Sequence, residues 1–347
     1  MRVIPPLTID ETVLISSTVL EPDPSIDPPI WSSGTAYVDG DRATVLSTHK
    51  VYESVGGSTG GFSPEVSVTK AVPKWIEVGF TNRWTMFDLY RSTPTITSTA
   101  ETTIILKTNL PDEAAVGVEG SFAISDTVIS PSLPAGVCYE EQIQQTPPNA
   151  LALLNMRNVA NVRIKATTVA DNIVKYDKTY SLTGRTTTSW YTYFFGGFPF
   201  LDTNSIVIFD LPITSGELYI EITFTGQMTI GTLALGTSEY VGQIQRGSSV
   251  DVQNFSTIER DIFGTTYIVP RRNIPKTNQR IYIDKSRLSE LLALKKRLDA
   301  IPVVWVGVDD PDDPYYFANL IVGFYKEFSF SIDNPIGPTV ILEVEEI

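Results

Sequence analysis

The hydrophobic pattern between residues 89 and 250 is that of many short strands. Glu217 to Phe224 alternates strictly: Leu218, Ile220 and Ile222 point to one face, and polar or aromatic side chains point to the other. This period of two is the signature of a half-buried strand. Further runs rich in β-branched and aromatic residues occur at 102–106, 162–166, 178–182, 205–211 and 231–236. Turn residues separate them, so the pattern predicts a β-sandwich or jelly roll over residues 89–250.

The pattern changes after residue 250. Leu288, Leu291, Leu292 and Leu298 recur at helical spacing within 285–299. Asp284 or Ser286 is the expected N-cap, and the cations at 295–297 suit the last turn of a helix. Strands are expected at 280–283, 303–308, 320–332 and 339–346. One helix among antiparallel strands predicts a small α+β domain over residues 251–347.

Residues 31–88 form a smaller unit with its own turn signals. Asp39 and Gly40 are a tight-turn pair between short strands, with further strands expected at 43–46 and 50–55. Four aromatic residues, Trp31, Tyr37, Tyr52 and Trp75, are spaced through a segment too small to bury much else. We expect them to form most of its core.

Residues 1–30 are interpreted as an extended N-terminal arm. Thr12 to Leu20 has the composition of one strand, and Glu21 to Pro29 is too rich in proline for a helix or a central strand. The segment is either a simple linker or an arm that reaches a neighbouring subunit.

Composition excludes several functions. The chain of 347 residues carries a formal net charge of −14 and no long basic run, which argues against nucleic-acid binding. It has one cysteine, Cys138, and one histidine, His49, so one chain offers neither a disulfide nor a Cys/His zinc site. His49 is interpreted as a turn or surface residue. We therefore expect no enzyme, no cofactor and no metal, and neither a signal peptide nor membrane insertion.

Two modules resemble known carbohydrate-binding folds. The succession of Trp31, Tyr37, Gly40-Asp41, Tyr52, Gly60, Pro64 and Trp75 resembles the chitin-binding type 3 module. That resemblance implies sugar binding by Trp31, Tyr37, Tyr52 and Trp75, although Glu53, Ser54 and Val55 stand where sugar-binding members usually carry exposed aromatics. Residues 155–167, 209–212 and 231–236 resemble a galactose-binding-like jelly roll.

A longer resemblance touches both ends of the chain. The opening MRVIPPLTID, the stretch TNRWTMFD at 81–88 and the run IVGFYKEFSFSIDNP near the end resemble tail proteins of bacteriophages. This implies a structural virion protein, made in the host cytoplasm, whose partners are other tail proteins and copies of itself in a cyclic homo-oligomer. The alternative is a receptor-binding tail protein that recognises host-surface glycan through the module or the jelly roll.

Two groups of residues are candidate interfaces. Trp190, Tyr191, Phe194 and Phe195 lie in an aromatic run that is interpreted as a seam against another domain or subunit, with sugar stacking as the alternative. Arg83, Trp84, Phe87 and Asp88 follow the module, and we expect them to lock its junction with the next domain rather than to contact a ligand.

Overall fold

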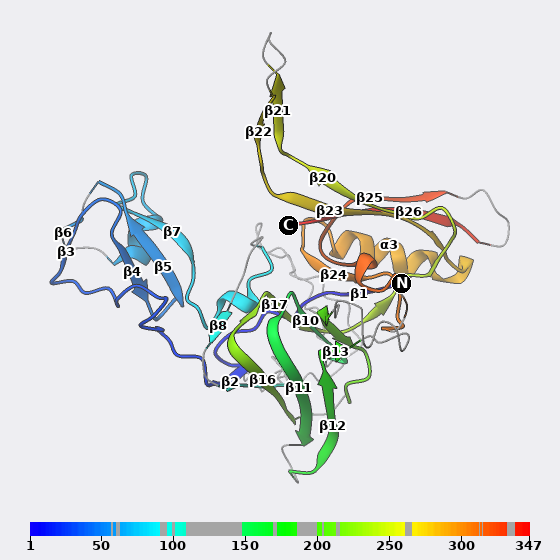
Figure 1. Cartoon of the computed structure of the whole chain (residues 1–347), viewed down its shortest axis with the longest axis horizontal. Coiled ribbons are helices and arrows are strands. Elements are labelled where there is room, and N and C mark those ends of the chain that lie inside the picture. The colour runs from blue at the N-terminus through cyan, green and yellow to red at the C-terminus, as the bar shows by residue number, and fades with distance from the viewer. Residues whose placement is uncertain are drawn as a thin grey trace, which may run out of the picture.

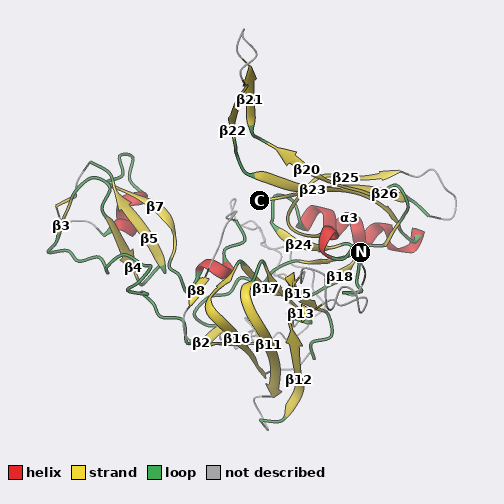
Figure 2. Ribbon diagram, in the orientation of Figure 1, coloured by secondary structure: helices red, strands yellow, loops and turns green. Residues whose placement is uncertain are grey.

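The computed structural model is mainly β, with antiparallel sheets throughout its main body (Figures 1 and 2). It describes residues 1–56, 58–59, 63–90, 96–98, 101–108, 148–168, 172–185, 200–202, 205–212, 216–260, 266–311, 313, 315–331 and 337–347. In the described residues, the layers of the main body are three large sheets and the helix α3, and the N-terminal module lies to one side of them. No described helix is long and apolar enough to cross a membrane.

The first layer is a six-stranded sheet. Its order is β12 (Val174–Ser181), β11 (Arg157–Thr168), β16 (Gly216–Ile230), β9 (Thr102–Lys107) and β2 (Leu14–Ser17), and β8 (Ile96–Ser98) also pairs with β16. The alternation expected for 217–224 is confirmed, because Leu218, Ile220 and Ile222 are buried while Glu221 and Thr223 are not. The buried face packs against the second layer.

The second layer is a three-stranded sheet with both faces covered. Its order is β15 (Ile206–Ile208), β10 (Ala150–Leu154) and β17 (Thr232–Gly236). Leu151 and Leu153 join the core shared with the six-stranded sheet, whereas Ala150 and Ala152 face the third layer. Burial on both sides explains why β10 and β17 are apolar at almost every position instead of alternating.

The third layer is an eight-stranded sheet. It runs through β18 (Glu239–Tyr240), β1 (Arg2–Ile4), β24 (Val303–Val306), β25 (Leu320–Ser331), β26 (Thr339–Glu346), β23 (Asn273–Tyr282) and β19 (Gln243–Ile244), with β20 (Ser249–Asn254) also paired to β23. In β24, Val304 and Val306 face the three-stranded sheet, whereas Val303 and Trp305 face the helix.

The helix predicted for 285–299 is confirmed, in two parts. A 3₁₀ turn, η3 (Lys285–Arg287), leads into α3 (Leu288–Arg297), and the Asp284 side chain accepts a hydrogen bond from Ser286 N at 3.2 Å. Leu291, Leu294 and Leu298 are buried against the sheet. The expectation for Leu292 is wrong, because its side chain is 43% exposed and Leu294 takes the buried position.

The expectation of an extended arm over residues 1–30 is also wrong where these residues form β1 and β2, because both strands belong to the sheets of the body. β1 is an inner strand, paired with β18 on one side and with β24 on the other. Val3 and Ile4 are fully buried. β2 pairs with β9 in the six-stranded sheet. The reason is that each short strand completes a sheet whose other strands come from distant parts of the chain. For the same reason β18, β19 and β20 belong with the eight-stranded sheet, although they precede or adjoin residue 250.

The N-terminal module is a small antiparallel unit. β4 (Arg42–Val45), β5 (Lys50–Ser54) and β7 (Trp75–Phe80) form a three-stranded sheet, and β3 (Ala36–Tyr37) pairs with β6 (Ser58–Thr59). A short helix, α1 (Pro64–Val68), and a 3₁₀ turn, η1 (Thr85–Phe87), complete it. Gly40 has φ +88°, which the predicted tight turn requires.

One element leaves the layered body altogether. Beyond β20 the chain continues into β21 (Thr257–Arg260), which pairs with β22 (Thr266–Val269) before the chain returns along β23. In Figure 1 this two-stranded ribbon points away from the sheets. The remaining described elements are the pair β13 (Thr183–Arg185) and β14 (Phe200–Asp202), and the turn η4 (Phe317–Asn319).

Candidate functional site

The module's aromatic residues lie mostly in its core. Trp75 is completely buried, and Tyr52 and Tyr37 are 3% and 9% exposed. Tyr37 meets Trp75 edge to face, with 5.0 Å between ring centroids, and the Tyr37 hydroxyl accepts a hydrogen bond from Ser32 N at 2.9 Å. Trp31 packs against this group and stays half-buried. Three of the four predicted sugar-binding rings therefore offer no open face on which a sugar could stack.

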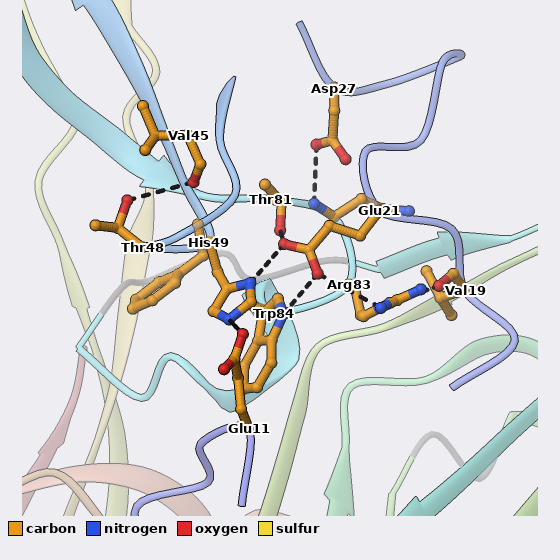
Figure 3. A network of polar contacts seen from close by, with 12 residues as sticks. Glu11, Val19, Glu21, Asp27, Val45, Thr48, His49, Thr81, Arg83 and Trp84 are labelled. Carbon is orange, nitrogen blue, oxygen red and sulfur yellow. Dashed lines mark hydrogen bonds and ion pairs between the residues drawn. The ribbon is translucent and has the colours of Figure 1, made fainter. Parts of the chain in front are cut away.

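The most developed polar cluster is centred on Glu21, whose side chain is 5% exposed (Figure 3). Its Oε1 accepts hydrogen bonds from Thr81 Oγ1 at 2.8 Å and, in the tautomer that donates, from His49 Nδ1 at 2.9 Å. Its Oε2 accepts from Trp84 Nε1 at 2.8 Å and lies 3.5 Å from Arg83 Nη1. A buried carboxylate is stable only with such partners. We call Glu11, Glu21, His49, Thr81, Arg83 and Trp84 the Glu21 joint.

Backbone structure brings these side chains together from four segments, of which the one before β2 supplies Glu11. Glu21 comes from the proline-rich segment, His49 from the turn between β4 and β5, and the last three residues from the end of β7 and the turn after it. His49 has φ +56°, a left-handed conformation that is uncommon outside glycine. The His49 carbonyl accepts from Thr81 N at 2.8 Å, which holds the turn against the end of β7.

His49 lies between two carboxylates and on an indole ring. Its Nε2 is 3.0 Å from Glu11 Oε1, on the opposite side from Glu21, and its ring stacks on Trp84 with 4.2 Å between centroids and an interplanar angle of 24°. The Glu11 side chain is 74% exposed, in contrast to Glu21. The His49 ring thus contacts Glu11, which lies before β2, and Glu21, which lies after it, and holds both beside the turn between β4 and β5.

A second set of contacts fixes the segment that follows Glu21. Asp27 accepts from Asn82 N and from Asp23 N, at 2.9 and 2.8 Å. Burial raises the pKa of Asp27, and the Asp23 and Glu21 charges act in the same direction against those two backbone donors. Arg83 Nε donates to Val19 O at 2.7 Å. The proline-rich segment is thus bound along its length to residues 81–83.

A cavity of about 250 Å³ opens beside the joint, where the module meets the six-stranded sheet. It is lined by Glu11, Leu14, Ile15, Ser16, Ser17, Glu21, His49, Arg83 and Trp84. Its ionisable lining groups are the carboxylates of Glu11 and Glu21, the guanidinium of Arg83 and the imidazole of His49. Within the described residues no cluster of three or more His, Cys, Asp or Glu side chains is placed to hold a metal ion.

The expected interface residues fall into two groups. Trp190, Tyr191, Phe194 and Phe195 lie outside the described residues. Phe87 packs edge to face on Trp84 at 5.7 Å, and Asp88 is buried and accepts from Tyr90 N at 3.0 Å. Arg83 and Trp84 make their contacts inside the chain, across the junction between module and body.

Sequence reasoning missed Glu21 and underrated His49. Glu21 stands in a segment whose prolines predict an exposed, extended path, and nothing local marks its carboxylate as buried. His49 does lie in a turn as expected, yet its ring is mostly covered. The available signal was that the chain's one histidine precedes a strand of a module whose end, at 81–84, is rich in hydrogen-bond donors.

Searches against protein-family models, curated proteins and solved structures found no match for this chain. Its function is therefore argued from the geometry of its own residues.

Proposed function

We propose that this chain is a structural subunit of a bacteriophage tail that assembles with copies of itself and with other tail proteins. The observation that carries the proposal is the burial of Tyr37, Tyr52 and Trp75, which makes them the module's core rather than a sugar platform. The Glu21 joint supports it further, because its hydrogen bonds hold the end of the module against the proline-rich segment that follows β2, instead of leaving Glu21 as a free charged group in the cavity. The assignment to a virion rests on the resemblance of residues 1–10, 81–88 and 321–335 to tail proteins of bacteriophages.

The finer architecture is part of the same proposal. The six-stranded and three-stranded sheets share one hydrophobic core, which supports a galactose-binding-like jelly roll. The eight-stranded sheet with α3 on one face supports a C-terminal α+β domain. Such folds serve as spacers as well as binders, so the proposal assigns them a scaffolding role.

The decisive experiment is to locate the chain in purified virions. Purified virions would be analysed by mass spectrometry, and an antibody raised against the full chain would be used for immunogold electron microscopy. The proposal expects the chain in intact particles and label on the tail in a fixed position. Absence of the chain from purified particles, with known tail proteins detected in the same sample, would refute it.

The alternative function, recognition of a host-surface glycan, is favoured by one observation. Trp31 remains half exposed at the surface of the module, as a residue that stacks on a sugar would. Binding of the chain to host polysaccharide would be compared with that of Trp31→Ala. Saturable binding that the substitution abolishes would move the assignment to receptor binding, whereas no binding by either chain would remove this alternative.

A further inference from the structure

Residues 249–278, which we call the ribbon, have an unusual surface. They comprise β20, β21, β22 and the first part of β23: β20 and β23 lie at the edge of the eight-stranded sheet, and β21 and β22 project from the body (Figure 2). Every residue of β20 and β22 is exposed. Seven of the exposed side chains are large and apolar: Val250, Val252, Phe255, Ile258, Tyr267, Ile268 and Val269. Scattered apolar residues are normal on a surface, but a ribbon that concentrates them marks an interaction site.

The strand register places these side chains on both faces of the ribbon. Ile258 lies opposite Ile268, so the two share one face, with exposures of 61% and 62%. Tyr267 and Val269 occupy the other face, opposite Glu259 and Thr257. Among the described residues, β21 and β22 pair only with each other. A two-stranded hairpin is at best marginally stable alone in water, so both faces gain from being covered.

The charge of the ribbon indicates what covers it. Residues 249–278 hold four cations and three carboxylates, a net charge of +1. The segments 1–88, 89–248 and 279–347 hold six against eleven, nine against fourteen, and seven against twelve, so each carries −5. Of these four segments only the ribbon is net positive, and an acidic surface that suits it is available on another copy of the same chain.

The size of the ribbon is adequate for such a contact. A standard stable interface uses about 20 to 30 residues from each partner, and the ribbon has 25 described residues, of which 19 are exposed. Its outgoing path, residues 249–260, spans about 40 Å at strand rise, enough to cross from one subunit to the next. Ser256 Oγ accepts from Arg271 N at 3.0 Å, which ties the two strands together where β20 gives way to β21.

We propose that the ribbon docks on the acidic body of a second copy of this chain, burying its apolar side chains there. This deepens the proposed function, on which it rests, by naming the surface through which subunits assemble. The contact joins unlike surfaces of the two copies, the ribbon of one and the body of the next. Repetition of such a contact closes into a ring or continues as a stack.

The test is the solution mass of the purified full chain over a range of concentrations, by light scattering and sedimentation. The wild type should self-associate, and Ile258→Asp with Ile268→Asp should raise the dissociation constant by roughly thirtyfold or more, because a carboxylate buried in an interface centre is strongly unfavourable. The matched control is Val38→Asp with Val72→Asp, two equally exposed apolar side chains in the module. It carries the same added charge and should associate like the wild type.

A second variant and a mixing experiment keep the test decisive. If circular dichroism shows that the double aspartate variant is not folded, Ile258→Thr with Ile268→Thr retains strand propensity and removes only apolar area. The ribbon variant keeps its body surface intact, so labelled variant should still bind wild-type ribbons in mixtures. Raising the salt concentration should weaken association.

Three results would overturn the proposal: a wild type that stays monomeric at its highest soluble concentration, ribbon variants that associate normally, or a control that is equally impaired. The outcome is separable from the tail assignment. Self-association through the ribbon in a protein absent from virions refutes the tail function alone, and a tail protein that does not self-associate through the ribbon refutes this inference alone.

Discussion

The Glu21 joint and the ribbon distribute polarity in opposite ways. In the joint, a carboxylate is buried and surrounded by donors from the same chain. In the ribbon, isoleucine, valine and tyrosine side chains stand in solvent, and within the described chain no third strand pairs with β21 or β22. In the joint, the buried carboxylate has its hydrogen-bond donors within the same chain. In the ribbon, the apolar side chains remain exposed to water, so the ribbon, rather than the polar cluster, indicates a partner.

The sharpest way to break the joint is Glu21→Ala. Removing the shared acceptor leaves the Trp84 indole N–H and the Thr81 hydroxyl without their hydrogen-bond acceptor and takes the ion-pair partner from Arg83. We expect the free energy of local opening to fall by about 3 kcal/mol. Amide hydrogen exchange of residues 21–27 and 49–54 measures that free energy. Glu11→Ala is the matched control from the exposed side of His49, and we expect about 0.5 kcal/mol or less. Equal effects of the two substitutions would show that burial does not set the joint's strength.

A smaller change isolates one hydrogen bond. Trp84 Nε1 donates to Glu21, whereas the buried Trp75 Nε1 has no hydrogen-bond partner among the residues that the structure describes. Trp84→Phe and Trp75→Phe both leave extra space, but only the first loses a bond to a charged acceptor. We therefore expect Trp84→Phe to cost about 1 to 2 kcal/mol more, although Trp75 is the more deeply buried. Thermal unfolding followed by circular dichroism compares them, and a larger loss for Trp75→Phe would contradict the assignment.

A substitution in the ribbon, in contrast, should change the stability of the single folded chain very little. Ile258→Thr exchanges an exposed apolar side chain for a polar one, so monomer stability should change by no more than about 0.5 kcal/mol. Denaturant unfolding at a concentration where the chain is monomeric gives the value. A loss of 2 kcal/mol or more would mean that Ile258 is packed within its own chain and that the contrast with the joint is false.

The smallest effect is expected from substitution of Glu346, the last residue of β26. Burial raises the pKa of Glu346 above its ordinary value of 4.5, with only Arg272 acting against the shift. As the pH rises past 4.5, the unfolded chain loses this proton before the folded chain does, and the wild type loses stability relative to Glu346→Gln. The variant's advantage should grow above pH 4.5 and level off once the folded carboxyl ionises. Urea unfolding across this range measures it; an advantage confined to lower pH would be the wrong sign.

Local patterns in the sequence were enough for regular elements. The alternation of 217–224 gave β16 its correct buried face, and the leucine spacing with Asp284 gave α3 and its N-terminal cap. Both depend on neighbours a few residues apart, which a sequence displays directly. Even there Leu292 was misplaced, because residues at both edges of an apolar stripe satisfy the same spacing.

Features that depend on distant partners were out of reach. The segment Arg2 to Ile4 is too short for its sequence to predict a strand. Its place in the sheet is set by pairing with Val304, Trp305 and Val306. Glu21 is buried because residues 28 and 60 positions away, His49 and Thr81, converge on it. The ribbon was missed for another reason: exposed apolar residues in strands look, in sequence, like ordinary core residues.

The pairing of β1 with β24 also sets a schedule for synthesis. About 300 residues separate these partners along the chain. At 5 to 20 residues per second, a ribosome needs roughly 15 to 60 s between making Val3 and making Trp305. Through that interval β1 has no β24 to pair with, and Val3 and Ile4 lack the neighbours that bury them in the complete sheet. The eight-stranded sheet therefore forms late, and a chain that ends between residues 240 and 303 offers β1 its β18 partner but not β24.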